Sequence, residues 1–300
     1  MLQLSENKNL NGIIEYGICP LSVIPIRVSP SHRSELISQM LFGEMAEILE
    51  AKGKHWLRII CESDGFIGWV ERDQILSISE NNYLKYKNNF AFSLEMMQPA
   101  IGVDSFISVT MGARLPEYDG LRFSLNKLKY SFGGQAIPND KLKATPEMIV
   151  KLARKYLNTP YLWGGRSPLG IDSSGLVQIV YQMAGISIPR DPQEQVKCGT
   201  SIEFIELAQP GDIAFFENRY GKIVHSGIIL SDNQLLHSLG QVKIDVMDHY
   251  GVFDLNKNLY LKSLRIIKRL LPTINVKSES YLAKENSISN TEQLSLNMTY

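Results

Sequence analysis

The sequence predicts an α+β protein in which two small β-barrels precede a larger C-terminal domain of helices packed on an antiparallel sheet. Short β-branched and aromatic runs, separated by turn residues, fill the first half of the chain, as in small antiparallel barrels. In the second half, two segments with helical spacing precede a run of strand-like segments, the order typical of an α+β domain. With 300 residues and 44% hydrophobic content, the chain is long enough for about two or three domains.

The charge balance excludes several classes of partner. Lysine and arginine together number 31, as do aspartate and glutamate, so we expect no nucleic-acid partner and no anionic membrane. No run of about 18 apolar residues occurs, and the N-terminus lacks the basic start and apolar core of a signal peptide. We therefore expect a cytoplasmic protein with small or peptidic partners, although a chain whose leader had been removed would look the same.

The three cysteines indicate neither a disulfide framework nor a metal site. Cys19, Cys61 and Cys198 are odd in number, irregularly spaced and without a CxxC pair. We expect them to be buried structural thiols, since free cysteine often packs as a small hydrophobe. The sequence implies no metal and no organic cofactor.

A barrel is predicted over residues 17–80, after a short N-terminal extension at residues 1–16. A second and less periodic barrel is predicted over residues 81–142. The strands of both are expected where β-branched and aromatic residues recur between turns. These segments cover residues 23–28, 45–49, 55–60 and 65–70 in the first barrel, and residues 106–109, 115–120 and 130–134 in the second.

The C-terminal domain is predicted over residues 143–271, and residues 272–300 form a polar tail. The tail cannot bury enough apolar area to offset its ordering entropy, so we expect it to be mobile. Within the domain, apolar runs with strand character follow the helices. They cover residues 213–216, 223–230, 234–238, 242–246 and 259–267.

Two helices open this domain. Thr145 fits an N-cap with Pro146 at the first helical position, and apolar residues at helical spacing continue to Leu157. The second helix begins near Ser173, after an aromatic and glycine-rich loop, and Gly185 fits its C-cap. Ser173 is therefore expected where unpaired N–H groups and the helix dipole favour a developing negative charge, as a readily ionised nucleophile requires.

Two histidines lie in neighbouring strand-like segments. His225 has apolar neighbours, and Gly227 leaves room for a second backbone or a substrate to approach. His237 falls in the next predicted strand, and adjacent antiparallel strands can set two side chains beside each other on one face. One imidazole would then orient the other. Since a lone histidine in a strand is more often structural, the assignment depends on both being present.

The order of these motifs resembles that of the NlpC-type family of papain-like cell-wall cysteine peptidases. A strand at 68–70, Gly-Trp-Val, is similar to one typical of bacterial SH3-like domains, which makes the predicted barrels SH3-like. Together the resemblances cover residues 17–270. The motifs in the family's order are PYLWGG at 160–165, DSSG at 172–175, PGD at 210–212, His225 with Gly227, and His237 before Leu239 and Gly240.

The resemblance implies a triad in which position 173 carries the nucleophile, His225 is the general base and His237 orients it. The implied substrate is a murein-derived peptide with a free N-terminal amine, cut after γ-D-glutamate and before a diamino acid such as diaminopimelate or lysine. Peptide recycling is the task we expect of a cytoplasmic enzyme of this kind.

The resemblance also implies a substrate-binding set. Asp172 and Ser174 would help to bind the amine, Tyr161 and Trp163 would wall the cleft, and Tyr118 of the second barrel either leans into the cleft or packs at the domain junction. We expect Arg190 to make a structural salt link with a nearby carboxylate rather than to bind a substrate carboxylate.

Ser173 departs from the family, whose motif has cysteine here. A helix N-terminus and an imidazolium can lower a thiol pKa from about 8.5 into the neutral range, whereas an alcohol stays protonated. Because losing a triad nucleophile can cost on the order of a million-fold in turnover, we expect little or no activity. The G-x-S-x-G setting of serine hydrolases is absent around Ser173 and Ser174.

Two interpretations of Ser173 stay open. Either the serine was introduced into an active peptidase, or the chain is a natural, non-catalytic pseudoenzyme that binds murein peptides. A third hypothesis about function is amide or acyl transfer through a thioester on the same fold.

Overall fold

The computed structural model describes residues 15–231, 233–254 and 257–271. Most of the predicted N-terminal extension and all of the predicted tail therefore lie outside the described residues. Within these ranges, no helix is both long enough and apolar enough to cross a membrane.

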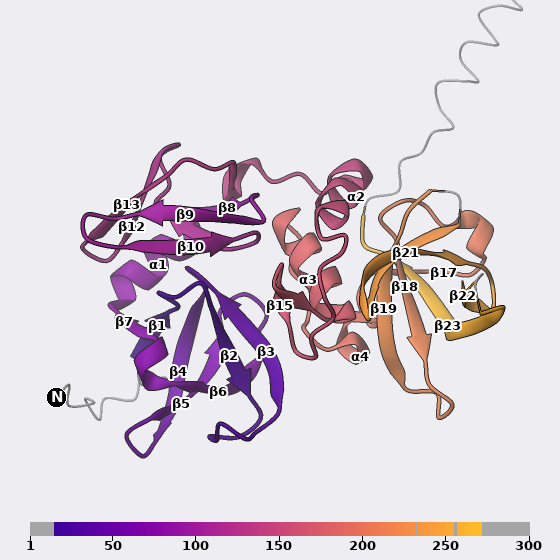
Figure 1. Cartoon of the computed structure of the whole chain (residues 1–300), viewed down its shortest axis with the longest axis horizontal. Helices are drawn as coiled ribbons and strands as arrows, with labels where there is room; N and C mark the ends of the chain where they lie inside the picture. Colours follow the sequence, from indigo (N-terminus) through magenta and orange to yellow (C-terminus); the bar gives the residue numbers. More distant parts are fainter. Residues whose placement is uncertain (1–14, 232, 255–256, 272–300) are drawn as a thin grey trace, which may run out of the picture. The chain divides into compact units, whose positions relative to one another are not determined.

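The first barrel is one antiparallel sheet of seven strands in the order β3-β2-β6-β5-β4-β1-β7 (Figure 1). In β2 and β5 buried and half-buried side chains alternate, so every second side chain enters a shared core. The four predicted strands are confirmed as β2, β4, β5 and β6; the sequence analysis missed β1, β3 and β7. The strands are β1 (Glu15–Ile18), β2 (Val23–Arg27), β3 (Leu36–Leu41), β4 (Met45–Lys52), β5 (Trp56–Cys61), β6 (Ile67–Glu71) and β7 (Leu76–Ile78).

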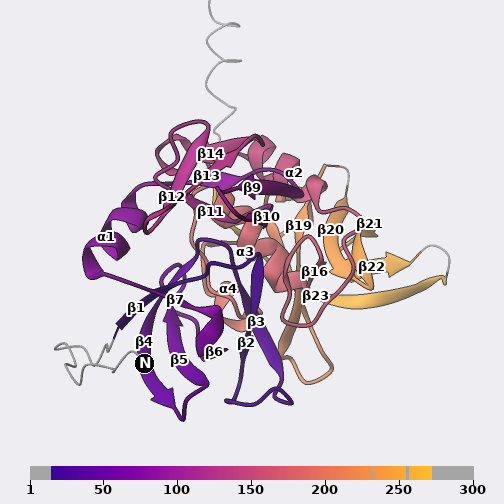
Figure 2. The same cartoon turned by 60° about the vertical axis from the view of Figure 1, so that its left-hand side comes forward.

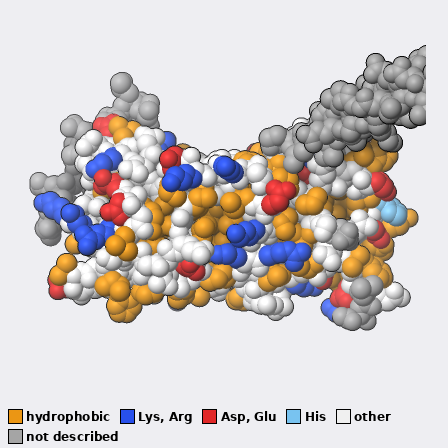
Figure 3. Space-filling model, turned by 90° about the horizontal axis from the view of Figure 1, so that it is seen from above, with side chains coloured by type: hydrophobic (Ala, Val, Ile, Leu, Met, Phe, Trp, Pro, Cys, Tyr) orange, Lys and Arg blue, Asp and Glu red, His pale blue; other side chains and the backbone are white. Residues whose placement is uncertain are grey.

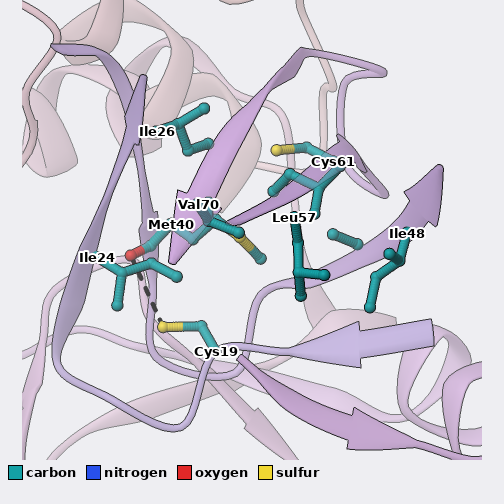
Figure 4. Close-up of a cluster of buried hydrophobic side chains, with 10 residues drawn as sticks. Cys19, Ile24, Ile26, Met40, Ile48, Leu57, Cys61 and Val70 are labelled. Atoms are coloured by element: carbon teal, nitrogen blue, oxygen red, sulfur yellow. Dashed lines mark hydrogen bonds between the residues drawn. The ribbon is translucent and has the colours of Figure 1, made fainter. Parts of the chain in front are cut away.

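Two of the cysteines belong to this core. Cys19 and Cys61 are buried, and Cys19 Sγ donates a hydrogen bond to the Met40 carbonyl at 3.9 Å (Figure 4). Burial raises the pKa of the Cys19 thiol, which makes it a poor nucleophile. Cys198 is only half-buried, so the expectation of a buried thiol is wrong for this residue.

The region of the second predicted barrel holds two small antiparallel sheets, β10-β9-β13-β12 and β11-β8-β14. It is joined to the first barrel by α1 (Glu80–Asn88), a largely polar helix that the sequence pattern did not reveal and that buries only Tyr83 and Tyr86. The strands are β8 (Phe90–Ser93), β9 (Met97–Ile101), β10 (Phe106–Thr110), β11 (Arg114–Pro116), β12 (Arg122–Leu125), β13 (Leu128–Phe132) and β14 (Ala136–Pro138).

The helices of the C-terminal domain begin where their sequence signals predict. In α2 (Pro146–Lys155), Thr145 Oγ1 accepts a hydrogen bond from the backbone N–H of Met148 at 3.2 Å. The next helix, α3 (Ser173–Met183), is buried along its whole length, and the chain leaves it at Gly185 with φ of +93°. A short helix, α4 (Pro192–Gln195), follows.

The sheet of this domain is more closed than predicted. Its strands run β17-β23-β18-β19-β20-β21-β22, and β22 also pairs with β23, so six of them form a ring. The long strand β23 pairs with both β18 and β22, and each of these two pairings contains a β-bulge, where a strand can bend. The strands are β17 (Thr200–Ile202), β18 (Ile213–Glu217), β19 (Ile223–Ile229), β20 (Gln234–Leu239), β21 (Gln241–Met247), β22 (Gly251–Asp254) and β23 (Leu259–Arg269).

The buried helix α3 is the element on which the domain is assembled. It packs against β19 and β20 of the ring and also contacts the short hairpin β15 (Arg166–Ser167) and β16 (Gly170–Ile171). The hairpin strand β15 in turn contacts β3 of the first barrel, and Figures 1 and 2 show α3 between the barrel and the ring. The residues at the start of α3 are therefore surrounded by both.

On the face seen in Figure 3, the surface has no large patch of only positive or only negative charge. Lysine and arginine lie interspersed with aspartate and glutamate there, with hydrophobic side chains between them. This agrees with the formal net charge of zero.

Candidate active site

Ser173 is the first residue of α3, and Asp172 is its N-cap. Asp172 Oδ1 accepts a hydrogen bond from the N–H of Gly175 at 2.7 Å, and Oδ2 accepts one from the N–H of Gly164 at 2.9 Å. These bonds fix the turn into the helix, so the side chain of Ser173 lies at the positive end of the helix dipole. The residue is 6% exposed and lines two neighbouring cavities.

The two histidines lie side by side on adjacent strands, as predicted. His225 is on β19 and His237 on β20, and His225 Nε2 lies 2.8 Å from His237 Nδ1. Gly227 is the register partner of His237, and a Cβ at Gly227 would lie 2.9 Å from the Cβ of His237. The glycine therefore makes room for the second histidine, not for a substrate.

A third group, Asp245 on β21, completes the row. Its Oδ2 lies 3.0 Å from His237 Nε2 and 2.7 Å from Lys243 Nζ. Partial burial alone would raise the pKa of Asp245, but the hydrogen bonds from His237 and Lys243 outweigh it and the pKa lies below its ordinary value. Asp245 is therefore an ionised hydrogen-bond acceptor.

The ionised carboxylate decides which nitrogen of each histidine carries a proton. Because Asp245 only accepts, His237 must donate from Nε2, and in a neutral imidazole its Nδ1 is then an acceptor. His225 must in turn donate from Nε2, which leaves His225 Nδ1 as the basic nitrogen. Both histidines are neutral near pH 7 because burial lowers their pKa values, and a proton on His237 would lower the pKa of His225 further.

Two cavities meet at Ser173. One, of about 410 Å³, lies between the first barrel and the start of α3; the other, of about 270 Å³, opens on the ring and contains His225. Tyr161 and Trp163 line both cavities. The larger cavity is also lined by Glu35, Ile37, Phe66, Asp172, Ser174 and Arg190, and the smaller by Val224, Ser238, Leu239, Gly240 and Lys262.

Arg190 binds Asp172 and Ser174, the two residues that were predicted to bind the substrate amine. It is 4% exposed; its Nη2 lies 2.6 Å from Asp172 Oδ2, and its Nη1 donates to Ser174 Oγ at 2.8 Å. With the bonds from Gly164, Gly175 and Ser174, the four acceptor positions of Asp172 are filled. The expected structural salt link of Arg190 is therefore present, and both candidate amine ligands are engaged in it.

Tyr118 is not brought to either cavity. Its hydroxyl donates to the Gly120 carbonyl at 2.7 Å, and its ring packs edge-on against Phe132 of the same module. The expectation that it leans into the cleft is wrong, because its side chain packs within the second module and lines neither cavity.

The sequence analysis missed five charged residues at the site: Asp191 and Lys222, which line the larger cavity, and Glu35, Asp245 and Lys262. Glu35 precedes β3 of the first barrel, and its Oε1 accepts a hydrogen bond from Trp163 Nε1 at 2.7 Å. Nothing local marks Glu35, because a long-range contact brings it to the cavity. Asp245 did have a signal: Lys243 and Asp245 alternate along the strand paired with that of His237, so both face it. Lys262, on β23, carried no signal of its own.

Comparison with known proteins identifies two segments of the chain. Residues 158–261 match the NlpC/P60 family, and residues 26–75 match the bacterial dipeptidyl-peptidase SH3 domain. A γ-D-glutamyl-L-lysine dipeptidyl-peptidase of Bacillus subtilis is 27% identical over 253 residues, which cover 77% of this chain and 80% of that protein. Dipeptidyl-peptidase 6 of Lysinibacillus sphaericus is 25% identical over 238 residues, covering 72% and 85%.

Solved structures give the same fold. An NlpC/P60 family protein from Bacillus cereus superimposes with a TM-score of 0.74 at 20% identity, over 86% of this chain and 100% of that one. Peptidases of the NlpC/P60 family are cysteine peptidases, whereas this chain has Ser173 at the start of α3. The chain therefore carries an NlpC/P60-family domain, preceded by a bacterial dipeptidyl-peptidase SH3 domain.

Proposed function

We propose that this chain binds murein-derived peptides with a free N-terminal amine, at a site built to cleave after γ-D-glutamate and before a diamino acid. Ser173 replaces the nucleophilic cysteine, so the chain as it stands is inactive or nearly so. The observation that carries the proposal is the meeting of Ser173 and His225 in one cavity, with His225 backed by His237 and Asp245.

With a thiol at position 173, the steps follow from this arrangement. His225 Nδ1 takes the thiol proton, and the thiolate attacks the carbonyl carbon of the γ-glutamyl amide. The N–H groups at the start of α3 favour the negative charge that develops there. The imidazolium of His225 then gives its proton to the leaving amine of the diamino acid, and water hydrolyses the thioester.

With serine in place of cysteine, the first step fails. An alcohol is far less acidic than a thiol, so the same helix end and imidazole leave Ser173 protonated. The cavities and the hydrogen-bonded row behind His225 do not depend on the hydroxyl. Peptide binding is therefore expected to survive where turnover does not.

The proposed substrate rests on the relatives and on the larger cavity. Two matched proteins are named γ-D-glutamyl-L-lysine dipeptidyl-peptidases, and this supports the choice of bond. The carboxylate of Glu35 and the aromatic walls of Tyr161 and Trp163 suit a short peptide that begins with an ammonium group. In this proposal Glu35, not Asp172 or Ser174, meets the amine, since Arg190 already engages those two.

Restoring the thiol tests the proposal. We expect Ser173→Cys to hydrolyse L-Ala-γ-D-Glu-diaminopimelate faster than the parent chain by a factor on the order of a million, with release of free diaminopimelate measured by chromatography. The double variant Ser173→Cys/His225→Gln keeps the thiol and removes the base, so it should fall back close to the parent chain. Absence of hydrolysis by a folded Ser173→Cys protein would contradict the peptidase assignment.

A pseudoenzyme that only binds the peptide is the second candidate, and the serine itself favours it. The same experiment separates the two. If Ser173→Cys binds the tripeptide in calorimetry and never cuts it, the binding function is correct. If it also forms a new amide when an amine acceptor is added, the site transfers acyl groups through the thioester.

A further inference from the structure

Lys262 places a positive charge beside the reacting groups. It lies on β23, is half-buried and lines the smaller cavity together with Ser173 and His225. The pKa of His225 is lowered by burial, by His237 and, least, by the positive charge of Lys262. The other charged groups facing His225 are His237 and, behind it, Asp245 and Lys243.

Lys262 forms no ion pair with the residues that the structure describes, whereas Lys243 pairs with Asp245 at 2.7 Å. The acidic residues that line the cavities, Glu35, Asp172 and Asp191, line the larger one, and none of them lines the smaller. A half-buried ammonium without a partner favours an anionic ligand next to it.

The reaction fixes which part of the substrate lies there. In the proposed mechanism His225 protonates the leaving amine, so the amine nitrogen of the diamino acid must lie within hydrogen-bond reach of His225. Of the two cavities at Ser173, the smaller is lined by both His225 and Ser173, and the larger by Ser173 without His225. The carbon that bears the leaving amine also bears the α-carboxylate of the diamino acid, so that carboxylate is held close to Lys262.

We infer that Lys262 binds a carboxylate carried by the residue that follows the scissile bond, and so selects peptides that end at the diamino acid. The inference rests on the proposed function and adds the subsite on the leaving side. The α-carboxylate of a C-terminal lysine and the side-chain carboxylate of diaminopimelate share this chemistry. A further peptide bond at the α-carboxyl group would remove the first of them.

The parent chain itself is suited to the test, because Ser173 leaves the peptide uncut while binding is measured. We would titrate it by calorimetry with L-Ala-γ-D-Glu-L-Lys, with its C-terminal amide, and with the diaminopimelate peptide amidated only at the α-carboxyl group. We expect the free acid to bind about five-fold more tightly than the lysine amide, the strength of a partly solvated ion pair. Affinity of the diaminopimelate peptide at the level of the free acid would assign the side-chain carboxylate as a second ligand.

Substitution of Lys262 should abolish the difference. In Lys262→Met the free acid and the amide should bind equally, at the affinity of the amide for the parent chain, and Lys262→Glu should reverse the preference. Lys268→Met is the matched control, since Lys268 is on the same strand but donates to Ser201 Oγ at 3.0 Å and does not line the cavity. This variant should keep the five-fold preference.

Two failures can be told apart. An acid-to-amide ratio that stays the same in a folded Lys262→Met and Lys262→Gln overturns the inference and leaves the proposed function intact. No binding of any of the three peptides to the parent chain overturns the proposed function, and the inference with it.

Discussion

Of the two β-rich modules that precede the NlpC/P60 domain, the first barrel supplies Glu35, Ile37 and Phe66 to the larger cavity, whereas the second module supplies no residue to either cavity. The second module is attached elsewhere: Lys155 Nζ of α2 donates to its Leu94 carbonyl at 2.7 Å. The contrast teaches that β-rich modules in one chain can differ in role: the first shapes the site, whereas the second packs against the domain and, through Arg114 and Glu62, against the first barrel.

The first barrel reaches the site because it contacts the loop that precedes α3. The carbonyl of Leu36 lies so close to Gly164 that a Cβ there would be 2.6 Å from the oxygen, and the φ of Gly164 is +75°. Next to it, the guanidinium of Arg166 forms two hydrogen bonds with the carboxylate of Glu44, at 2.7 and 2.9 Å, and both side chains are buried. The barrel is thus locked against the loop that leads to Ser173.

Breaking this lock should give the largest effect. Arg166→Met leaves the Glu44 carboxylate buried without its partner, so we expect the free energy of unfolding to fall by about 3–5 kcal/mol in urea titrations. Lys197→Met removes an exposed ion pair with Glu194 and should cost less than about 1 kcal/mol. A loss for Arg166→Met no larger than that of this control would show that the buried pair does not hold the barrel.

A smaller effect is expected on ligand binding, where a substitution in the first barrel should matter and one in the second module should not. We expect the parent chain to bind L-Ala-γ-D-Glu-L-Lys about ten-fold more tightly than its N-acetyl derivative, because Glu35 pairs with the free amine. Glu35→Gln should remove most of this preference in calorimetry, while Tyr118→Phe should leave it unchanged. If Tyr118→Phe removed the preference and Glu35→Gln did not, the second module, not the first barrel, would contribute to amine binding.

The smallest expected effect is on the pH dependence of stability, and it comes from His225, which lies in neither module. Its pKa in the folded state lies well below the ordinary 6.5, so the unfolded chain binds more protons and stability is lost as the pH falls through about 6.5. For one such histidine the loss between pH 7 and pH 6 is about 0.7 kcal/mol. Urea unfolding at both values should show it in the parent chain and in Tyr118→Phe, and His225→Gln should reduce it. An unchanged slope in His225→Gln would mean that this histidine is not buried neutral.

Local signals predicted much of the fold. Thr145 and Pro146 marked the start of α2, and Gly185 marked the end of α3, because caps and left-handed turns depend on a few neighbouring residues. The closure of the ring was not predictable, since it depends on β23 pairing with both β18 and β22. Helix α1 was missed because its sequence is largely polar.

In the site, too, residues marked by local patterns were predicted, and those placed by long-range contacts were not. Ser173, His225 and His237 were identified by motif order and strand pairing, and the structure brings all three together at the cavities or directly behind them. Glu35 was missed, and Tyr118 chosen wrongly, because the sequence does not reveal which module contacts the loop before α3. A docking contact of this kind depends on the fit of whole surfaces, which no short pattern encodes.

The closed ring has a consequence for how such a protein tolerates insertions. Because β19, β20 and β21 are paired on both sides, a slip of one residue in any of them would disrupt two ladders at once and turn its side chains to the opposite face. Connections at the rim, such as the turn between β18 and β19, bear no such constraint. Chain length could therefore change there, and the mouth of the cleft be remodelled, while His225, His237 and Asp245 keep their alignment.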